Sequence, residues 1–288
     1  MDVVGLIVGP LRYPFMVRGL VAAVMVGIVC ATVGTYVVLR GMAFLGDALA
    51  HAVLPGVAVG YLVSGGARGA VFWWGLGTGV LTAVWIGAVS RRAQIKEDAA
   101  IGIIFAGMFA LGIALISTMR SYAVDLAHFL FGDVLGVSNG DLWLTGALGG
   151  VILLTIVALY KEFLVLSFDP VLAVTLRLPS TLLHYLLLVL IALTIVVSLQ
   201  TVGVALMVAM LVTPAATAYL LTRRLPAMMG LAALIGALSG VSGLYLSYYV
   251  RVASGAAIVL VCTTFFLMAL LLSPRRGLVW GWLRRLGG

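Results

Sequence analysis

Two ionisable side chains lie in a stretch of sequence that is otherwise apolar. In GDALAHAVLPG, residues 46–56, Asp47 and His51 are four residues apart among Ala, Val, Leu and Gly. Residues at this spacing share one face of an α-helix, about 6 Å apart along its axis, so both side chains can reach one ligand. A carboxylate oxygen with an imidazole nitrogen suits divalent ions such as Zn, Mn or Fe. The pair is therefore a candidate metal site.

A simpler interpretation of this pair stays open at this point. Asp47 and His51 can bond to each other or cap a short helix near a membrane interface. A carboxylate at the centre of a spanning helix costs roughly 2.5–3.5 kcal/mol, however, and ionisable groups there are by default functional. Pro55 and Gly56 break the helix just after His51, which is tolerated where backbone lines a cavity. These residues favour the functional interpretation.

A second interrupted helix is predicted in VALMVAMLVTPAATAYLL, residues 204–221. Pro214 frees the main-chain carbonyl near Met210, and Thr213 and Thr217 add hydroxyl oxygens one turn apart. These residues are candidates for lining the same pathway. An ordinary kink, with the threonine hydroxyls bonded back to the helix, fits the spacing equally well.

The remaining histidines and the two cysteines give weaker evidence for a functional site. Asp125 and His128 are three residues apart in a loop, where a solvated surface pair is favoured over a metal contact. His184 lies near the end of an apolar run and is interpreted as an interfacial side chain. Cys30 and Cys262 lie inside apolar runs and are interpreted as small core residues with no redox role.

The segment KEFLVLSFDPVLAVTLRLP, residues 161–179, has the pattern of a docking element. Asp169 and Pro170 suit the N-cap and the first position of a helix, so a short amphipathic helix of two to three turns is expected. The alternative is a helix lying on the lipid surface. Because Arg177 is the one basic residue in that helix, electrostatic attraction to lipid headgroups would contribute little to the second alternative.

The sequence contains no motif for nucleotide hydrolysis or for a zinc-peptidase site. It has no GxxxxGK[ST] phosphate loop and no HExxH motif. If ATP powers transport, the ATPase is another chain.

Composition places these residues in a membrane. Of the 288 residues, 64% are hydrophobic and 9% are charged, against about 25% charged in soluble domains. The net charge of +8 comes mostly from arginines scattered singly or in pairs between apolar runs, which is typical of membrane-flanking loops and not of a nucleic-acid groove. The N-terminus does not have the pattern of a cleaved signal peptide, because Pro10 and Pro14 interrupt its short apolar run.

We predict an all-α polytopic membrane protein that forms a single transmembrane domain over residues 1–288. A span needs about 20 apolar residues, and about nine such runs are present, with eight as the alternative. A further apolar stretch, 126–137, is too short to cross and is expected to be re-entrant. Gly75 and Gly79, at GxxxG spacing, predict a face where helices approach closely. The predicted spans are 17–39, 42–63, 70–90, 99–118, 142–160, 181–200, 204–221, 228–249 and 255–272.

The distribution of Arg and Lys predicts the orientation. With nine spans, the richer set of loops is cytoplasmic, which puts the C-terminus inside and the N-terminus outside. Eight spans would instead move Arg12 and Arg18 inside. The richer set is Arg40, Arg91, Arg92, Lys96, Lys161, Arg177, Arg223, Arg224, Arg275, Arg276, Arg284 and Arg285. The poorer set is Arg12, Arg18, Arg68, Arg120 and Arg251.

Four blocks of the chain resemble the membrane permease subunits of bacterial manganese, zinc and iron uptake ABC transporters. They are GDALAHAVLPGVAVGYL, SFDPVLAVTLRLP, QTVGVALMVAMLVTPAATAYLLTRRL and SYYVRVASGAAIV, in the expected order. The resemblance implies a type II importer-like fold in the bacterial inner (cytoplasmic) membrane and a homodimer. It also implies two copies of a cytoplasmic ATPase and an extracytoplasmic metal-binding protein that delivers the ion.

The resemblance also implies roles for particular residues. Asp47 and His51 match the pair that lines the pathway and coordinates the metal. The segment with Asp169, Pro170, Ala173 and Arg177 matches the ATPase-coupling helix; these are the coupling residues. Two positions depart from the pattern, because Arg177 stands where Gly is expected and Ala253 where Pro is expected. With Arg177, the coupling helix is expected either to extend further along the chain or to bind its ATPase differently.

The sequence therefore predicts a non-catalytic permease for a divalent transition metal, with no permanently bound cofactor. Across a two-fold axis, two copies of Asp47 and His51 would offer two carboxylates and two imidazoles. One alternative is a proton-coupled secondary carrier with this pair as a proton relay, which would need internal inverted repeats. Another is an intramembrane metalloenzyme, which would need a third ligand and a base within the spans.

Overall fold

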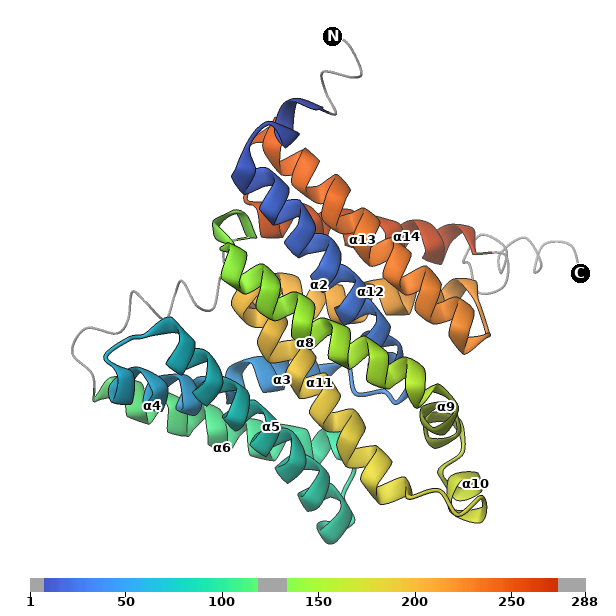
Figure 1. Ribbon diagram of the computed structural model, residues 1–288. Coiled ribbons are helices and arrows are strands. Elements are labelled where there is room, and N and C mark those ends of the chain that lie inside the picture. Colours follow the sequence, from blue (N-terminus) through green and yellow to red (C-terminus); the bar gives the residue numbers. More distant parts are fainter. Residues whose placement is uncertain (1–7, 119–133, 274–288) are drawn as a thin grey trace, which may run out of the picture.

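The computed structural model describes residues 8–118 and 134–273, and the regular secondary structure in these ranges is helical. Within them, nine segments are long and apolar enough to cross a membrane, which confirms the predicted all-α class and span number (Figure 1). The helices are α2 (Pro14–Leu39), α3 (Phe44–Ala52), α4 (Leu54–Ser64), α5 (Arg68–Ala93), α6 (Glu97–Ser117), η1 (Val134–Gly136), α8 (Asn139–Ala158), α9 (Tyr160–Phe168), α10 (Pro170–Thr175), α11 (Ser180–Val202), α12 (Val204–Leu221), α13 (Leu225–Val250) and α14 (Ser254–Leu272).

Two of the spans form the core of the bundle. In both α2 and α11, 72% of the most apolar window is buried, against 22% in α6, α8 and α14. The helix α2 packs mainly against α13 and α12, and it lies alongside α13 in Figure 1. At these crossings Gly27 meets the main chain of Gly236, and Gly34 meets the main-chain oxygen of Leu211. Small residues let the helix backbones touch, as expected for packing in lipid.

The predicted second span is divided into two helices. α3 ends at Ala52 and α4 begins at Leu54, so the interruption falls next to Pro55. Proline has no N–H to donate to the carbonyl four residues earlier, which here is that of His51. Val53, between the two helices, keeps right-handed helical angles, and the polypeptide therefore continues in nearly the same direction.

The predicted GxxxG face of α5 forms a helix crossing. A Cβ placed on Gly75 would lie 3.3 Å from Val57, and one on Gly79 would lie 3.1 Å from Val53. These small residues therefore bring α5 against the segment that follows His51.

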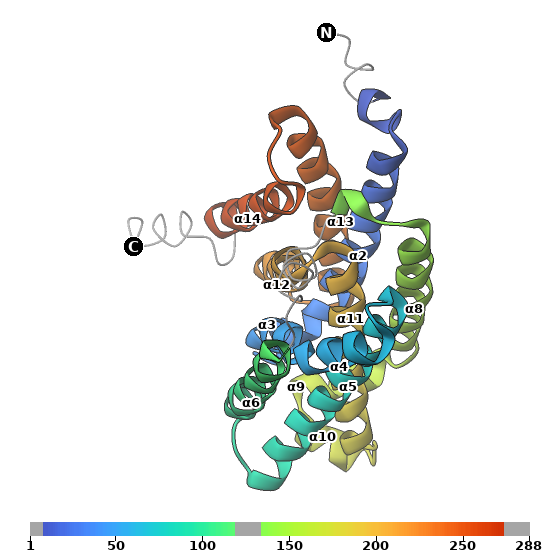
Figure 2. The same ribbon diagram turned by 90° about the vertical axis from the view of Figure 1, so that its left-hand side faces the viewer.

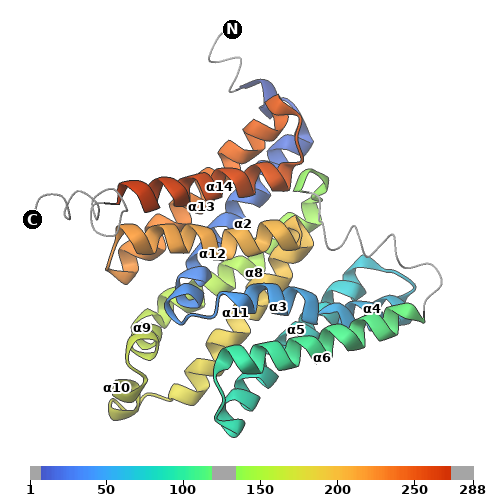
Figure 3. The same cartoon turned by 180° about the vertical axis from the view of Figure 1, so that it is seen from behind.

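The face of the molecule turned to the viewer in Figure 3 is formed by α14, α12, α3 and α6. Figure 2 shows that α8 lies on the opposite side. The helix that carries Asp47 and His51 is therefore at the surface of the isolated chain.

Loops far apart in sequence meet at one end of the bundle. Arg40, at the end of α2, bonds Glu97 at the start of α6 and His184 near the start of α11. Arg91, in the last turn of α5, bonds Thr181 of α11. The short helices α9 and α10 project at the end of the molecule away from the start of α2 (Figures 1 and 2).

The predicted re-entrant segment lies mostly outside the described residues, as do Asp125 and His128. Its last residues are described, and Val134–Gly136 form a 3-10 turn against α2.

Candidate functional site

The structure brings Asp47 and His51 together on one face of α3. The carboxylate Oδ1 of Asp47 lies 3.6 Å from Nδ1 of His51. The same Nδ1 is 3.0 Å from the main-chain oxygen of Asp47. Because a carbonyl oxygen only accepts hydrogen bonds, Nδ1 is the donor and carries the proton of a neutral imidazole. The lone pair on Nε2 of His51 is then free for another partner.

Two aromatic rings contact the His51 imidazole, and a third packs against one of them. Phe105 and Phe109 of α6 meet the His51 ring edge-on, with centroid distances of 6.2 and 5.6 Å. Phe44 packs edge-on against Phe105 at 5.8 Å. The rings restrict the orientation of His51 and exclude water from one side of it.

The Asp47–His51 pair is only partly covered in the isolated chain. The side chain of His51 is 26% exposed and that of Asp47 is 44% exposed, and the helix α3 that carries both lies on the face seen in Figure 3. Among the described residues, no cluster of three or more His, Cys, Asp or Glu is placed to bind a metal. One copy of the described chain therefore offers two side-chain donors at this point.

The helix α12, which carries the predicted residues, contacts α3 through Leu211. Contact between the two helices is close enough that a Cβ on Gly46 would lie 2.9 Å from Leu211. The hydroxyl of Thr217 donates to the main-chain oxygen of Thr213 at 2.7 Å, and Thr217 is 2% exposed. The simpler interpretation, a threonine bonded back to its own helix, therefore describes Thr217. Thr213 is half-buried, and Pro214 lies inside the helix and is buried.

The predicted docking segment is a short, capped helix. The carboxylate of Asp169 accepts from the main-chain N–H groups of Val171 and Leu172, at 3.0 and 2.9 Å, which confirms the N-cap. The helix α10 spans only Pro170–Thr175, so the expected length of two to three turns was too long.

The short helix ends at the position where the sequence departs from the family pattern. Arg177 has a φ of +55°, and the N–H of Leu178 donates to the main-chain oxygen of Ala173 at 3.0 Å. This is the Schellman ending that usually has glycine at the left-handed position. The first of the two alternatives, a helix that runs on past Arg177, was therefore wrong, because the turn forms despite the cost of a side chain there.

The segment from α9 to the end of this turn exposes apolar side chains. Phe168, Val171, Leu172 and Leu176 are 60%, 76%, 44% and 54% exposed, whereas Ala173 is fully buried. An exposed apolar patch of this kind marks an interaction surface.

A group that the sequence did not predict lies between three helix ends. His184, expected to be an interfacial side chain, is 3% exposed. Its Nδ1 lies 2.9 Å from Nη2 of Arg40, which also donates to Oε1 of Glu97 at 3.2 Å. Burial lowers the pKa of the Arg40 guanidinium and the Glu97 carboxylate opposes this. Hydropathy could not reveal the cluster, because its members are far apart in the sequence.

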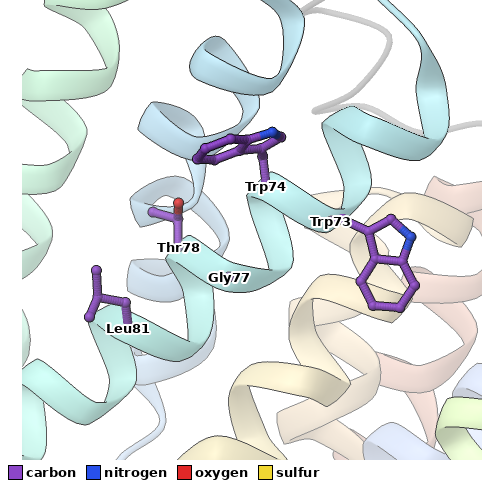
Figure 4. Close-up of a pocket in the computed structure, with 5 residues that line it drawn as sticks. All are labelled: Trp73, Trp74, Gly77, Thr78 and Leu81. Atoms are coloured by element: carbon purple, nitrogen blue, oxygen red, sulfur yellow. The ribbon is translucent and has the colours of Figure 1, made fainter. Parts of the chain in front are cut away.

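A shallow apolar pocket lies elsewhere, along α5. Figure 4 shows its lining residues, Trp73, Trp74, Gly77, Thr78 and Leu81, all on this one helix. Trp73 and Leu81 are more than half exposed. The pocket contains none of the predicted site residues and has the character of an outer, lipid-facing surface.

Known proteins resemble the chain over nearly its whole length. Residues 12–273 match the ABC 3 transport family. The manganese transport system membrane protein MntC of Halalkalibacterium halodurans is 50% identical over 270 residues, covering 93% of this chain and 91% of that protein. The chelated iron transport system membrane protein YfeD of Yersinia pestis is 39% identical, covering 92% of this chain and 88% of that protein. The solved structure of PsaBC from Streptococcus pneumoniae in complex with Fab matches with a TM-score of 0.83 and 40% identity, covering 98% and 100% of the two chains.

Proposed function

The chain belongs to the ABC 3 transport family, and from this premise we propose that it is the membrane permease of an ATP-driven importer of manganese or iron, with Asp47 and His51 as transient ligands of the ion. The permease is non-catalytic, and a separate ATPase hydrolyses the ATP. Relatives named for manganese and for iron support this choice of substrate. Membership of an ATP-driven family sets aside the proton-coupled carrier.

The hydrogen bonding of His51 is the observation that carries the proposal. Metal-bound histidines usually donate their second ring N–H to a carbonyl or carboxylate. Here Nδ1 already donates to the main-chain oxygen of Asp47, which leaves Nε2 as the ligand atom. The carboxylate of Asp47 adds a negative oxygen donor on the same face of α3. A small, open ligand set is suited to an ion in transit, because the site must release it.

A second copy of the chain would complete the coordination. Two side chains from one copy are fewer than the four or more ligands that these ions take. Asp47 and His51 are partly exposed, their helix α3 lies on the face formed by α14, α12, α3 and α6, and a carboxylate facing lipid is costly. A homodimer across a two-fold axis would cover this face and bring two Asp47–His51 pairs to one point.

The α10 segment supplies the surface for the ATPase. Asp169 caps the helix, Pro170 begins it and Ala173 is its fully buried residue. Its exposed apolar side chains face away from the bundle's core and need a protein partner. The positively charged loops lie at this end, so it is cytoplasmic. The opposite end would receive the ion from an extracytoplasmic binding protein.

The ligand role is tested by substituting the pair. The permease and its ATPase are reconstituted in proteoliposomes, and ATP-dependent uptake of Mn²⁺ is measured. We expect Asp47→Ala and His51→Ala each to lower uptake at least about ten-fold, because each removes a ligand of the ion. Assembly with the ATPase, followed by size-exclusion chromatography, should be unchanged, because the pair is far from α10.

The matched control is Asp98→Asn, which removes an exposed carboxylate in the first turn of α6 and should leave uptake at the wild-type level. Normal uptake by either Asp47→Ala or His51→Ala would overturn the ligand assignment. Uptake that persists without ATP and collapses with a proton uncoupler would overturn the importer itself.

A further inference from the structure

The Arg40–Glu97–His184 cluster joins three helix ends at the end of the bundle that carries α10. Arg40 caps α2, Glu97 begins α6, and His184 is in the second turn of α11. Nη2 of Arg40 donates to both partners, at 3.2 and 2.9 Å. The side chains are 14%, 29% and 4% exposed, in the order Arg40, Glu97, His184. Charged groups this buried are expensive unless paired.

The contacts fix the protonation pattern of the cluster. Arg40 can only donate, so Nδ1 of His184 accepts, and a neutral ring carries its proton on Nε2. Nε2 lies 3.6 Å from Oε1 of Glu97, too far for a good hydrogen bond. Both Nε2 of His184 and Nη1 of Arg40 are buried without a partner. The cluster is thus incompletely satisfied in this arrangement, and two of its nitrogens remain available for other partners.

The cluster is not a second metal site. Glu97 and His184 alone would offer two donors, but the Arg40 guanidinium lies between them and repels a cation. No third acid, His or Cys joins them in the part of the chain that the structure describes.

Each member of the cluster is close in sequence to a different feature of the proposed transport pathway: α3 with Asp47, the aromatic residues of α6, and the docking helix α10. After Arg40, the connection to α3 is fixed by a hydrogen bond from the N–H of Met42 to the oxygen of Val37, and Asp47 follows. Glu97 starts the helix whose Phe105 and Phe109 contact His51.

The third member connects to the docking helix. The turn after α10 is closed by two main-chain bonds, from Leu178 to Ala173 and from Ser180 to Leu178, and α11 with His184 follows directly. The helix α10 is therefore linked to His184 by a short, hydrogen-bonded path. Arg91 of α5 bonds Thr181 in the first turn of α11, and its guanidinium carbon lies 6.0 Å from the ring centroid of Tyr185. These contacts connect α5 to the start of α11.

We propose that Arg40, Glu97 and His184 are positioning residues that couple movement of α10 to the Asp47–His51 pair. This inference rests on the proposed function. When the ATPase moves α10, the start of α11 moves His184 against Arg40 and Glu97. Those two residues then shift α3 and α6, and with them the metal ligands and the aromatic rings around His51.

The test measures two rates on the same complex of permease and ATPase in proteoliposomes: Mn²⁺ uptake and ATP hydrolysis. Glu97→Gln removes the charge and keeps the shape, and His184→Leu removes both ring nitrogens at similar volume. We expect hydrolysis within about two-fold of wild type and a ratio of uptake to hydrolysis roughly ten-fold lower. His184→Asn keeps an acceptor at the position of Nδ1 and should restore most of the ratio.

Arg92→Gln is the matched control, because it removes an exposed charge at the same end without a contact to the cluster. An unchanged ratio in Glu97→Gln and His184→Leu overturns the proposal. A parallel fall of uptake, hydrolysis and the amount of assembled complex also overturns it, because that result is expected if the cluster only stabilises the fold. Failure of the wild-type complex to take up Mn²⁺ with ATP would instead remove the proposed function, and the coupling role with it.

Discussion

At the scale of single residues, the chemistry of the site depends on which nitrogen of His51 is free. A helical spacing of four brings Nδ1 over the main-chain oxygen of Asp47. In the proposed site, the same spacing would provide the second ligand and select the tautomer whose Nε2 can bind an ion. Moving either residue by one position would lose both effects.

Arg177 shows the energetic cost of a single unsuitable residue. Its left-handed φ of +55° costs a non-glycine residue about 1 kcal/mol or more. We predict that Arg177→Gly stabilises the turn by about 1 kcal/mol, so that hydrogen exchange of the amide groups in residues 170–180 slows about five-fold. Arg177→Ala is the control, because it removes the charge and keeps the strain; slowing of exchange by alanine as well would contradict the explanation.

The sequence predicted the adjacency of Asp47 and His51, which the structure shows, but it did not predict contacts between distant segments. Asp47 and His51 were found because ionisable groups are conspicuous in an apolar run. The burial of His184 was not found, since its partners Arg40 and Glu97 belong to other helices and hydropathy evaluates one segment at a time.

At the scale of helices, spans were predictable because length and hydropathy are local properties. The limits predicted for the fourth and seventh spans, 99–118 and 204–221, lie within two residues of α6 and α12. The interruption between α3 and α4 follows from Pro55, whereas the neighbours of each helix do not follow from hydropathy. Those neighbours are set by glycines whose contacts are visible only in the fold.

The crossing of α2 and α12 gives the clearest prediction at this scale. A Cβ on Gly34 would overlap the main-chain oxygen of Leu211, and backbone cannot yield as a side chain can. We expect Gly34→Ala to lower the yield of monodisperse protein in detergent several-fold, measured by size-exclusion chromatography. Gly77→Ala is the matched control, since nothing lies within 4 Å of its added Cβ; equal losses for the two variants would contradict the packing argument.

At the scale of the whole molecule, the distribution of basic residues distinguishes the two ends of the bundle. The loops rich in arginine and lysine gather at the end that carries α10, and this predicts the cytoplasmic side. The two natural cysteines are fully buried, so an introduced cysteine can be labelled against a low background.

We predict that Arg251→Cys reacts with a membrane-impermeant maleimide in intact spheroplasts and that Arg223→Cys reacts only after permeabilisation. Both arginines are exposed, and they lie at opposite ends of α13. The readout is the mass shift of the purified protein. The reverse pattern would invert the orientation and would place α10 on the wrong side for an ATPase.

The central position of α2 has a consequence for biosynthesis. Ribosomes deliver the N-terminal part of a chain first, yet the main partners of α2 are α12 and α13, which are among the last segments made. The mean hydropathy of α2 is 2.2, which is high enough for α2 to be stable in the bilayer as a single helix. Its glycine-containing faces would then have no helix packed against them until α12 and α13 are inserted. Final assembly is therefore a late, post-insertional event, and a chain truncated before α12 would present those faces to the membrane's quality-control proteases.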